Sequence, residues 1–212
     1  MIARLIARDL RRVFSGSAWL PIAFFLLVAA LVPFAVGPDA RLLSRIGSGV
    51  LWIAALTAAL LPIERLVEPD RADGVLDQLF LHGAAEESVA FAKIVAHWLT
   101  FGPLLLIAAI PGAGLLAMSG QSFVRTEIAL AVGTAGLASL AVAIAAVTSG
   151  FARSGSLAAL LLLPLAIPLL IFGAAASVGG HPSALPLEAA VSLLLTAGAP
   201  FVAGAAIRAG RT

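Results

Sequence analysis

Six long apolar runs divide the chain, and short polar segments separate them. Each run approaches the roughly 20 residues that a helix needs to cross a bilayer. The runs do not alternate between apolar and polar positions, which favours helices over the strands of a barrel. The expected spans are Trp19–Val36, Ile46–Ile63, Ile94–Met118, Ile128–Gly150, Leu157–Ala176 and Leu187–Ile207. The pattern predicts an all-α integral membrane protein with one transmembrane domain over residues 1–212.

Residues 1–14 show a second pattern, in which apolar and basic positions alternate at helical spacing. The apolar side consists of Ile2, Leu5, Ile6, Leu10 and Val13, and the basic side of Arg4, Arg8, Arg11 and Arg12. Such a helix lies in the membrane interface with its arginines near anionic lipid headgroups. A basic segment that only fixes the topology is the alternative. The first apolar run is too long for the core of a signal peptide, so we expect an uncleaved span.

The long polar interruption is residues 64–93, which hold seven of the chain's 11 acids. Within it, Asp70-Arg71-Ala72-Asp73 can cap a short amphipathic helix over Asp73–Phe80, because acids are favoured near a helix N-terminus, and Gly83 is expected to end it. Val75, Leu76, Leu79 and Phe80 would form the apolar face. A short amphipathic helix on a loop is suited to dock into a partner's groove. A helix that packs on its own bundle fits the same pattern.

The basic residues predict the orientation of the chain. If the N-terminus is cytoplasmic, only Arg41, Arg45 and Arg125 of the 13 lysines and arginines lie outside. Positive residues gather on the cytoplasmic side of membrane proteins. The sequence therefore predicts that both termini and the segment 64–93 are cytoplasmic.

Composition excludes several classes of function. The chain is 61% hydrophobic and 11% charged, has a mean hydropathy of +1.10 and contains no cysteine. Basic residues do not interleave with aromatic ones, so we expect no nucleic-acid partner. We find no catalytic set and no metal-ligand cluster, and predict neither an enzyme nor a metal site. The single lysine, Lys93, lies in Phe-Ala-Lys-Ile and cannot belong to a Walker A loop. Any ATP hydrolysis must come from a partner.

Four residues within the predicted spans are candidates for a polar or ligand site or for a helix kink. A histidine at membrane depth, such as His97, either makes a structural hydrogen bond or contacts a ligand or proton. Its neighbour Trp98 also fits an interfacial aromatic belt. Pro164 and Pro168 are four residues apart on one helix face, where each removes a backbone hydrogen bond. We expect a kink there, either in a static bundle or at a mobile point.

Four motifs together carry a family resemblance that runs nearly from end to end. They are Glu64-Arg65-Leu66, Asp73-Gly74-x-Leu76-x-Gln78-Leu79, Ala92-Lys93-x-x-Ala96-His97-Trp98-Leu99 and Leu163-Pro164-x-x-Ile167-Pro168-x-Leu170-Ile171-Phe172-Gly173. The combination resembles haem exporter protein B, the membrane subunit of the cytochrome c maturation ABC transporter.

The resemblance implies an ABC-2-type permease in the bacterial inner membrane, with an N-terminal interfacial helix, six spans and a cytoplasmic coupling helix. It implies a cytoplasmic ATPase partner, a homodimer of this chain, other cytochrome c maturation membrane subunits and a periplasmic haem chaperone. Haem would be transported or presented, with no cofactor bound covalently. Carried over by position, the coupling residues are Glu64, Glu68, Asp73, Leu76, Asp77, Leu79 and Phe80. An anchor that remodels a haem-carrying partner without moving haem, or an exporter of another substrate, stays open.

Overall fold

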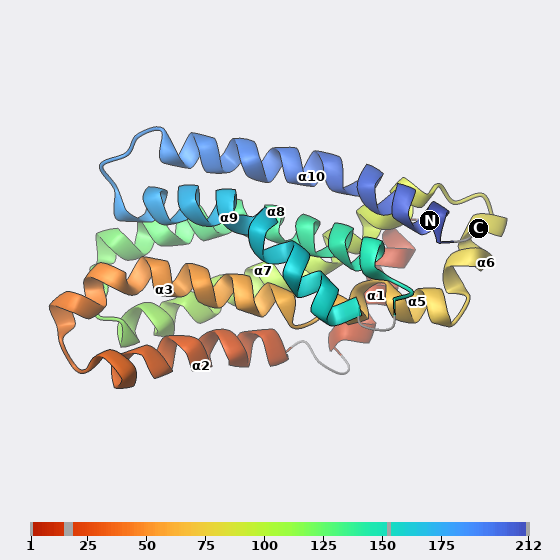
Figure 1. Ribbon diagram of the computed structural model, residues 1–212. Coiled ribbons are helices and arrows are strands. Elements are labelled where there is room, and N and C mark those ends of the chain that lie inside the picture. The colour runs from red at the N-terminus through yellow and green to blue at the C-terminus, as the bar shows by residue number, and fades with distance from the viewer. Residues whose placement is uncertain (1, 15–18, 152–153, 211–212) are drawn as a thin grey trace.

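The computed structural model describes residues 2–14, 19–151 and 154–210, and all regular structure in them is helical. Six of these helices are long and apolar enough to cross a membrane, and they lie side by side in one bundle (Figure 1). They are α2 (Trp19–Val36), α3 (Ala40–Leu60), α7 (Glu86–Leu115), α8 (Gly120–Thr148), α9 (Ser154–Val178) and α10 (Ala184–Ala209). The structure confirms the predicted all-α membrane fold.

Most helices begin earlier than the apolar runs that predicted them. α7 begins at Glu86 rather than Ile94, and α8 at Gly120 rather than Ile128. Polar side chains are favourable in a first helical turn, where backbone N–H groups lack intrahelical partners. Ser119 accepts such a bond from Ser122, and Asp39 accepts two at the start of α3. Hydropathy marks the part of a helix that suits lipid, while these caps mark where the helix begins.

Four short helices gather at the end of the bundle where the described chain termini lie (Figure 1). They are α1 (Ile2–Phe14), α4 (Ile63–Leu66), α5 (Glu68–Ala72) and α6 (Val75–Leu81). We call this the terminal end. At the opposite end, short links join α2 to α3, α7 to α8 and α9 to α10.

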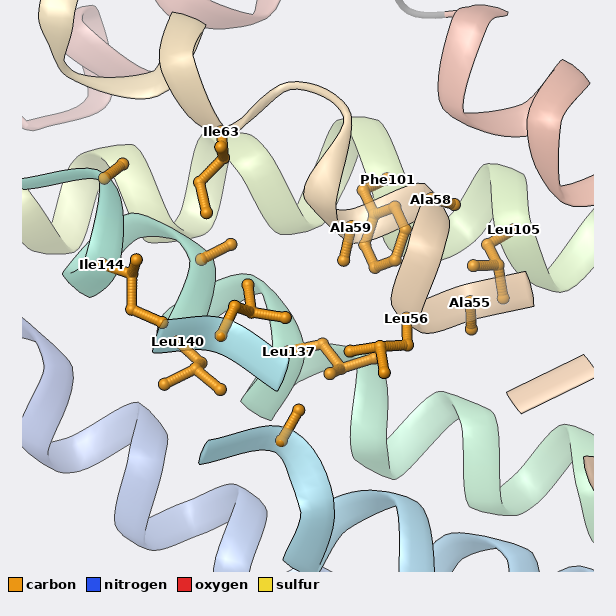
Figure 2. Close-up of a cluster of buried hydrophobic side chains, with 14 of the residues drawn as sticks. Ala55, Leu56, Ala58, Ala59, Ile63, Phe101, Leu105, Leu137, Leu140 and Ile144 are labelled. Carbon is orange, nitrogen blue, oxygen red and sulfur yellow. The ribbon is translucent and has the colours of Figure 1, made fainter. Parts of the chain in front are cut away.

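α8 is the central helix and packs against α3, α7, α9 and α10. The core where α3, α7 and α8 meet consists of closely spaced small and branched side chains (Figure 2). It includes Ala55, Leu56, Ala58 and Ala59 of α3, Phe101 and Leu105 of α7, and Leu137, Leu140 and Ile144 of α8. Small residues allow membrane helices to approach closely, so dispersion contacts accumulate along the interface.

Trp52 of α3 is the largest fully buried side chain and joins three helices. Its ring fills the space beside Gly133 of α8 and Gly173 of α9, where an added Cβ would collide with it. Its indole Nε1 donates a hydrogen bond to Ser177 Oγ at 3.2 Å. The two glycines therefore form the socket that receives this tryptophan.

α9 runs without interruption from Ser154 to Val178, with Pro164 and Pro168 inside it. The helix changes direction along its length in Figure 1. The kink that we assign to the proline pair stays a prediction, as does any mobility there.

Candidate functional site

The segment predicted to couple to a partner forms two helices joined by a turn. α5 begins with Glu68-Pro69, and proline suits a first turn because it needs no hydrogen-bond donor there. α6 begins at Val75 rather than Asp73, because Gly74 has a φ of +69° and ends the first helix. The expectation that Asp70–Asp73 caps the coupling helix is wrong: no side chain caps α6. Asp73 lies in the turn.

The predicted end of the coupling helix agrees with the structure. Gly83 has a φ of +78°, and its N–H donates to Phe80 O at 2.9 Å. The next N–H, of Ala84, donates to Leu79 O at 3.1 Å. This pair of bonds is a Schellman motif, which glycine favours because it lacks a Cβ. Gly83 thus ends α6 for the expected reason.

The apolar face of α6 packs inward. Leu76 is buried, and Leu79 and Phe80 pack partly against the hydrophobic core. The exposed side of the segment carries Asp73, Asp77 and Gln78, together with Leu81, whose side chain is 83% exposed. The three apolar residues predicted to contact a partner therefore anchor α6 to its own bundle. Leu81, which sequence reasoning missed, is the apolar residue that α6 presents outward.

Glu68 connects α5 to the turn between α8 and α9. Its carboxylate accepts a hydrogen bond from Arg71 Nη2 at 2.6 Å and another from the Gly150 N–H at 2.7 Å. The hydrogen bond from Arg71 lowers the pKa of Glu68 below its ordinary value. Glu64 is exposed and lies against Gly155 of α9. Both acids thus contact the start of α9 or the turn before it.

Asp70 is the centre of a buried ion cluster that sequence reasoning missed. Its side chain is 2% exposed and accepts hydrogen bonds from Lys93 Nζ at 2.5 Å, Arg8 Nη2 at 2.6 Å and Arg12 Nη1 at 3.0 Å. Burial opposes ionisation, yet the charges of Lys93 and Arg8 hold the pKa of Asp70 below 3.8. The cluster ties α5 to α1 and α7. Arg8 and Arg12 therefore face the protein rather than lipid headgroups alone.

Further bonds complete the connection between the terminal helices. Lys93 also donates to the backbone oxygen of Leu66 in α4 at 2.9 Å and lies 3.5 Å from Asp9. Arg208, near the end of α10, bonds to Glu87 at 2.8 Å and Glu86 at 3.3 Å at the start of α7. The segment 63–81 is therefore bonded to α1, α7 and the α8–α9 turn, and α10 is bonded to α7.

His97 and Trp98 face different surroundings. The imidazole is 5% exposed, its Nε2 has no hydrogen-bond partner among the described residues, and its ring stacks on Phe101 with centroids 5.6 Å apart. It lines a cavity of about 70 Å³ that extends to Asp70 and Arg65. Trp98 instead donates to Thr134 Oγ1 of α8 at 3.3 Å. Trp98 therefore has a hydrogen-bond partner within the bundle, whereas the Nε2 atom of His97 has none among the described residues.

Glu188 of α10 is a second buried acid, and it was not among the residues predicted to form a site. It is fully buried, and neither carboxylate oxygen has a hydrogen-bond partner in the described part of the chain. Its Oε1 lies beside Gly133, close to the Trp52 socket. One acid within the run Leu187–Ile207 was a visible signal, because such residues in a span are rare. Across residues 2–14, 19–151 and 154–210, no group of three metal-ligating acids, histidines or cysteines comes together.

The fold defines a multi-pass helical membrane protein whose polar segment 63–81 is bonded to its neighbouring helices at the terminal end. Comparison with known proteins identifies the family. The family model for the CcmB protein matches residues 1–210. Heme exporter protein B of Paracoccus denitrificans is 43% identical over 212 residues, covering 96% of this chain and 97% of that protein. Heme exporter protein B of Escherichia coli K12 is 39% identical over 216 residues, covering 98% of each.

The chain therefore belongs to the CcmB family, whose members named above are heme exporter proteins B. It is a membrane subunit of the haem export system. The resemblance stated from the four sequence motifs is confirmed.

Proposed function

We propose that this chain is the permease subunit of an ABC complex that exports or delivers haem for c-type cytochrome assembly. The observation that carries the proposal is the bonding of the segment 63–81 to several membrane helices at once. Asp70 bonds to α1 and α7, and Glu68 bonds to the α8–α9 turn. A displacement of this segment would therefore move the ends of several spans together. The sequence holds no Walker A loop, so an ATPase partner supplies the energy.

The proposal places the terminal end in the cytoplasm of a bacterial cell, at the inner membrane. The distribution of arginines along the chain supports this orientation. The ATPase would then contact the exposed side of α6, with Leu81 as an apolar anchor and Asp73 and Asp77 as polar contacts. Two copies of this chain would meet two ATPase subunits. Other cytochrome c maturation membrane subunits and a periplasmic haem chaperone would complete the assembly.

The small size of the cavity beside His97 favours a second candidate function, in which this chain anchors the ATPase and does not itself conduct haem. The cavity beside His97 has a volume of about 70 Å³, which holds a few water molecules. A haem macrocycle is much larger, so haem contact at His97 requires the cavity to open. In this version, ATP hydrolysis would release a haem-carrying partner. Proteoliposomes that hold this chain and its ATPase separate the two: haem that crosses on ATP addition supports the permease.

The docking surface is tested by Leu81→Asp, with Val178→Asp as the matched control. Val178 is 63% exposed near the end of α9, at the opposite end of the bundle. We expect Leu81→Asp to reduce recovery of the ATPase with the tagged chain at least about tenfold, because buried apolar anchors dominate interface energies. Val178→Asp should recover the ATPase as wild type does. Equal recovery with both variants would show that the ATPase does not use this face of α6.

A further inference from the structure

The cavity beside His97 has a polar mouth and an apolar inner wall. Five of its residues share one face of α7: Lys93, Ala96, His97, Thr100 and Phe101. The lining also includes Arg12 of α1, Arg65 of α4 and Asp70 of α5, and these short helices lie at the terminal end of the bundle, which forms the mouth (Figure 1). Because α7 rises 1.5 Å per residue, Phe101 lies roughly 12 Å deeper along the helix than Lys93. Polarity therefore falls along the cavity as it does across the surface of a bilayer.

Positive charge exceeds negative charge around this mouth. Four cations (Arg8, Arg12, Arg65, Lys93) surround the cluster and its cavity, against two acids (Asp9, Asp70), which leaves a surplus of two. Of the nearby acids, Glu68 pairs with Arg71, and Glu64 does not line the cavity. Arg65 has no acid at ion-pair distance in the described part of the chain. The surplus of positive charge therefore favours an anionic ligand.

His97 is a second polar group of the cavity, and it lies in the inner wall. His97 Nε2 is buried without a partner among residues 2–14, 19–151 and 154–210, and His97 lines this cavity. Native structures seldom leave a buried polar atom unpaired, and Nε2 is covered by protein atoms here, so a ligand in the cavity would reach it only after a small shift of the wall. The cavity volume of about 70 Å³ admits a small polar group. An anionic group that continues into a polar backbone, next to apolar walls, matches all three observations.

We propose that this cavity binds the phosphate group of an anionic phospholipid. Arg65 is the principal cation for the phosphate, since its planar guanidinium can donate two parallel hydrogen bonds to phosphate oxygens. His97 lies in the cavity wall, where a small shift would let its Nε2 pair with an ester or hydroxyl oxygen of the lipid. Pro21, Leu66 and Phe101 cover the adjoining apolar part. This site goes beyond haem export and stands whether or not an ATPase binds the chain.

The test uses the full purified chain, stripped of lipid in detergent and then mixed with phosphatidylglycerol, phosphatidylcholine or inorganic phosphate. Native mass spectrometry counts retained lipid, and thermal unfolding reports the affinity. We expect wild type to retain phosphatidylglycerol in preference to phosphatidylcholine. Arg65→Gln should weaken the apparent affinity roughly tenfold, as loss of a charge-assisted hydrogen bond implies. Arg11→Gln, an exposed arginine of α1 outside the cavity, should bind as wild type does.

Each outcome distinguishes the source of the phosphate or overturns the site. Stabilisation by inorganic phosphate that Arg65→Gln abolishes supports a phosphate site filled from solution rather than by lipid. Equal weakening in Arg65→Gln and Arg11→Gln overturns the proposal, because it indicates general attraction of basic residues to anionic lipid. No preference of wild type for phosphatidylglycerol or phosphate also overturns it. Arg65→Lys keeps the charge without the planar fork, so intermediate binding is expected, and it serves if Arg65→Gln does not fold.

Discussion

The terminal end and the opposite end of the bundle each hold a buried acid, and the two acids differ in whether they have bonding partners. At the terminal end, Asp70 is 2% exposed and bonds to three cations. Toward the opposite end, Glu188 is fully buried and has no partner among the described residues. A buried charge is stable only when it is paired and hydrogen-bonded. Asp70 is therefore part of the structure that holds helices together, whereas Glu188 contributes no bond within the described chain.

This contrast explains where a partner can act on the fold. Paired charges connect α1, α5 and α7 at the terminal end, and a hydrogen bond from Lys93 to the backbone oxygen of Leu66 adds α4. The helices of the opposite end are joined by short links, with caps such as Ser119. In the proposed function, a displacement of α5 would act on α1 and α7 through Asp70 and on the α8–α9 turn through Glu68. A displacement of a link at the opposite end would act on the two helices that it joins.

The largest effect is expected from Asp70→Asn, which removes the anion from a buried cluster. Lys93 is 6% exposed and would keep a buried charge without its closest counterion. Breaking a buried ion pair from one side costs about 3–5 kcal/mol. We expect a loss of that size in the free energy of unfolding, measured by denaturant titration in detergent. The double variant Asp70→Leu/Lys93→Met should recover part of it. An unchanged unfolding energy in Asp70→Asn would contradict the structural role of the cluster.

The same cluster predicts an acid dependence that serves as a control. The pKa of Asp70 is lowered in the folded state from an ordinary value of 3.8. Its stabilising contribution is therefore complete above that value and is lost as the pH falls through the folded-state pKa. Asp70→Asn should lack this part of the acid dependence, and unfolding curves of both proteins at decreasing pH measure the difference.

An intermediate effect is expected at the Trp52 socket, where α3, α8 and α9 meet. A Cβ at Gly173 would collide with the buried indole, so Gly173→Ala should cost about 1–3 kcal/mol through overpacking. Gly198→Ala is the matched control on α10, where a Cβ meets open space. It should be neutral or stabilising by up to about 1 kcal/mol, since alanine favours a helix. Unfolding in detergent measures both, and equal effects would argue against a tight socket.

The smallest effect is expected from Glu188→Gln. The substitution keeps the size of the side chain and breaks no hydrogen bond of the described residues. We expect the free energy of unfolding to change by less than about 1 kcal/mol, because an interaction that is absent cannot be lost. The same detergent titration measures it beside Asp70→Asn. A cost as large as that of Asp70→Asn would remove the contrast and show that Glu188 has a strong partner outside the described residues.

Local pattern predicted the parts of the fold that depend on neighbours in sequence. The six spans, the amphipathic α1 and the end of α6 at Gly83 follow from apolar run length, helical spacing and the freedom of glycine at positive φ. Most helices begin earlier than the apolar runs predicted, because a search for apolar runs leaves out the polar residues of the first helical turn. The coupling helix begins at Val75 rather than Asp73 because Gly74 at positive φ separates it from α5. Asp70, which the pattern offered as part of a cap, is an ion-pair partner instead.

The sequence by itself determined that this chain spans the membrane, where its polar segment lies, and that it carries no ATP-hydrolysing motif. Only the tertiary structure decided which side of α6 faces inward, which cations meet Asp70 and which polar atoms line the cavity at His97. Arg8 and Asp70 are 62 residues apart and Lys93 and Asp70 are 23 apart. Helical periodicity relates residues three or four positions apart, so no local pattern encodes such pairs. They arise when helices pack and bring distant charges together out of water.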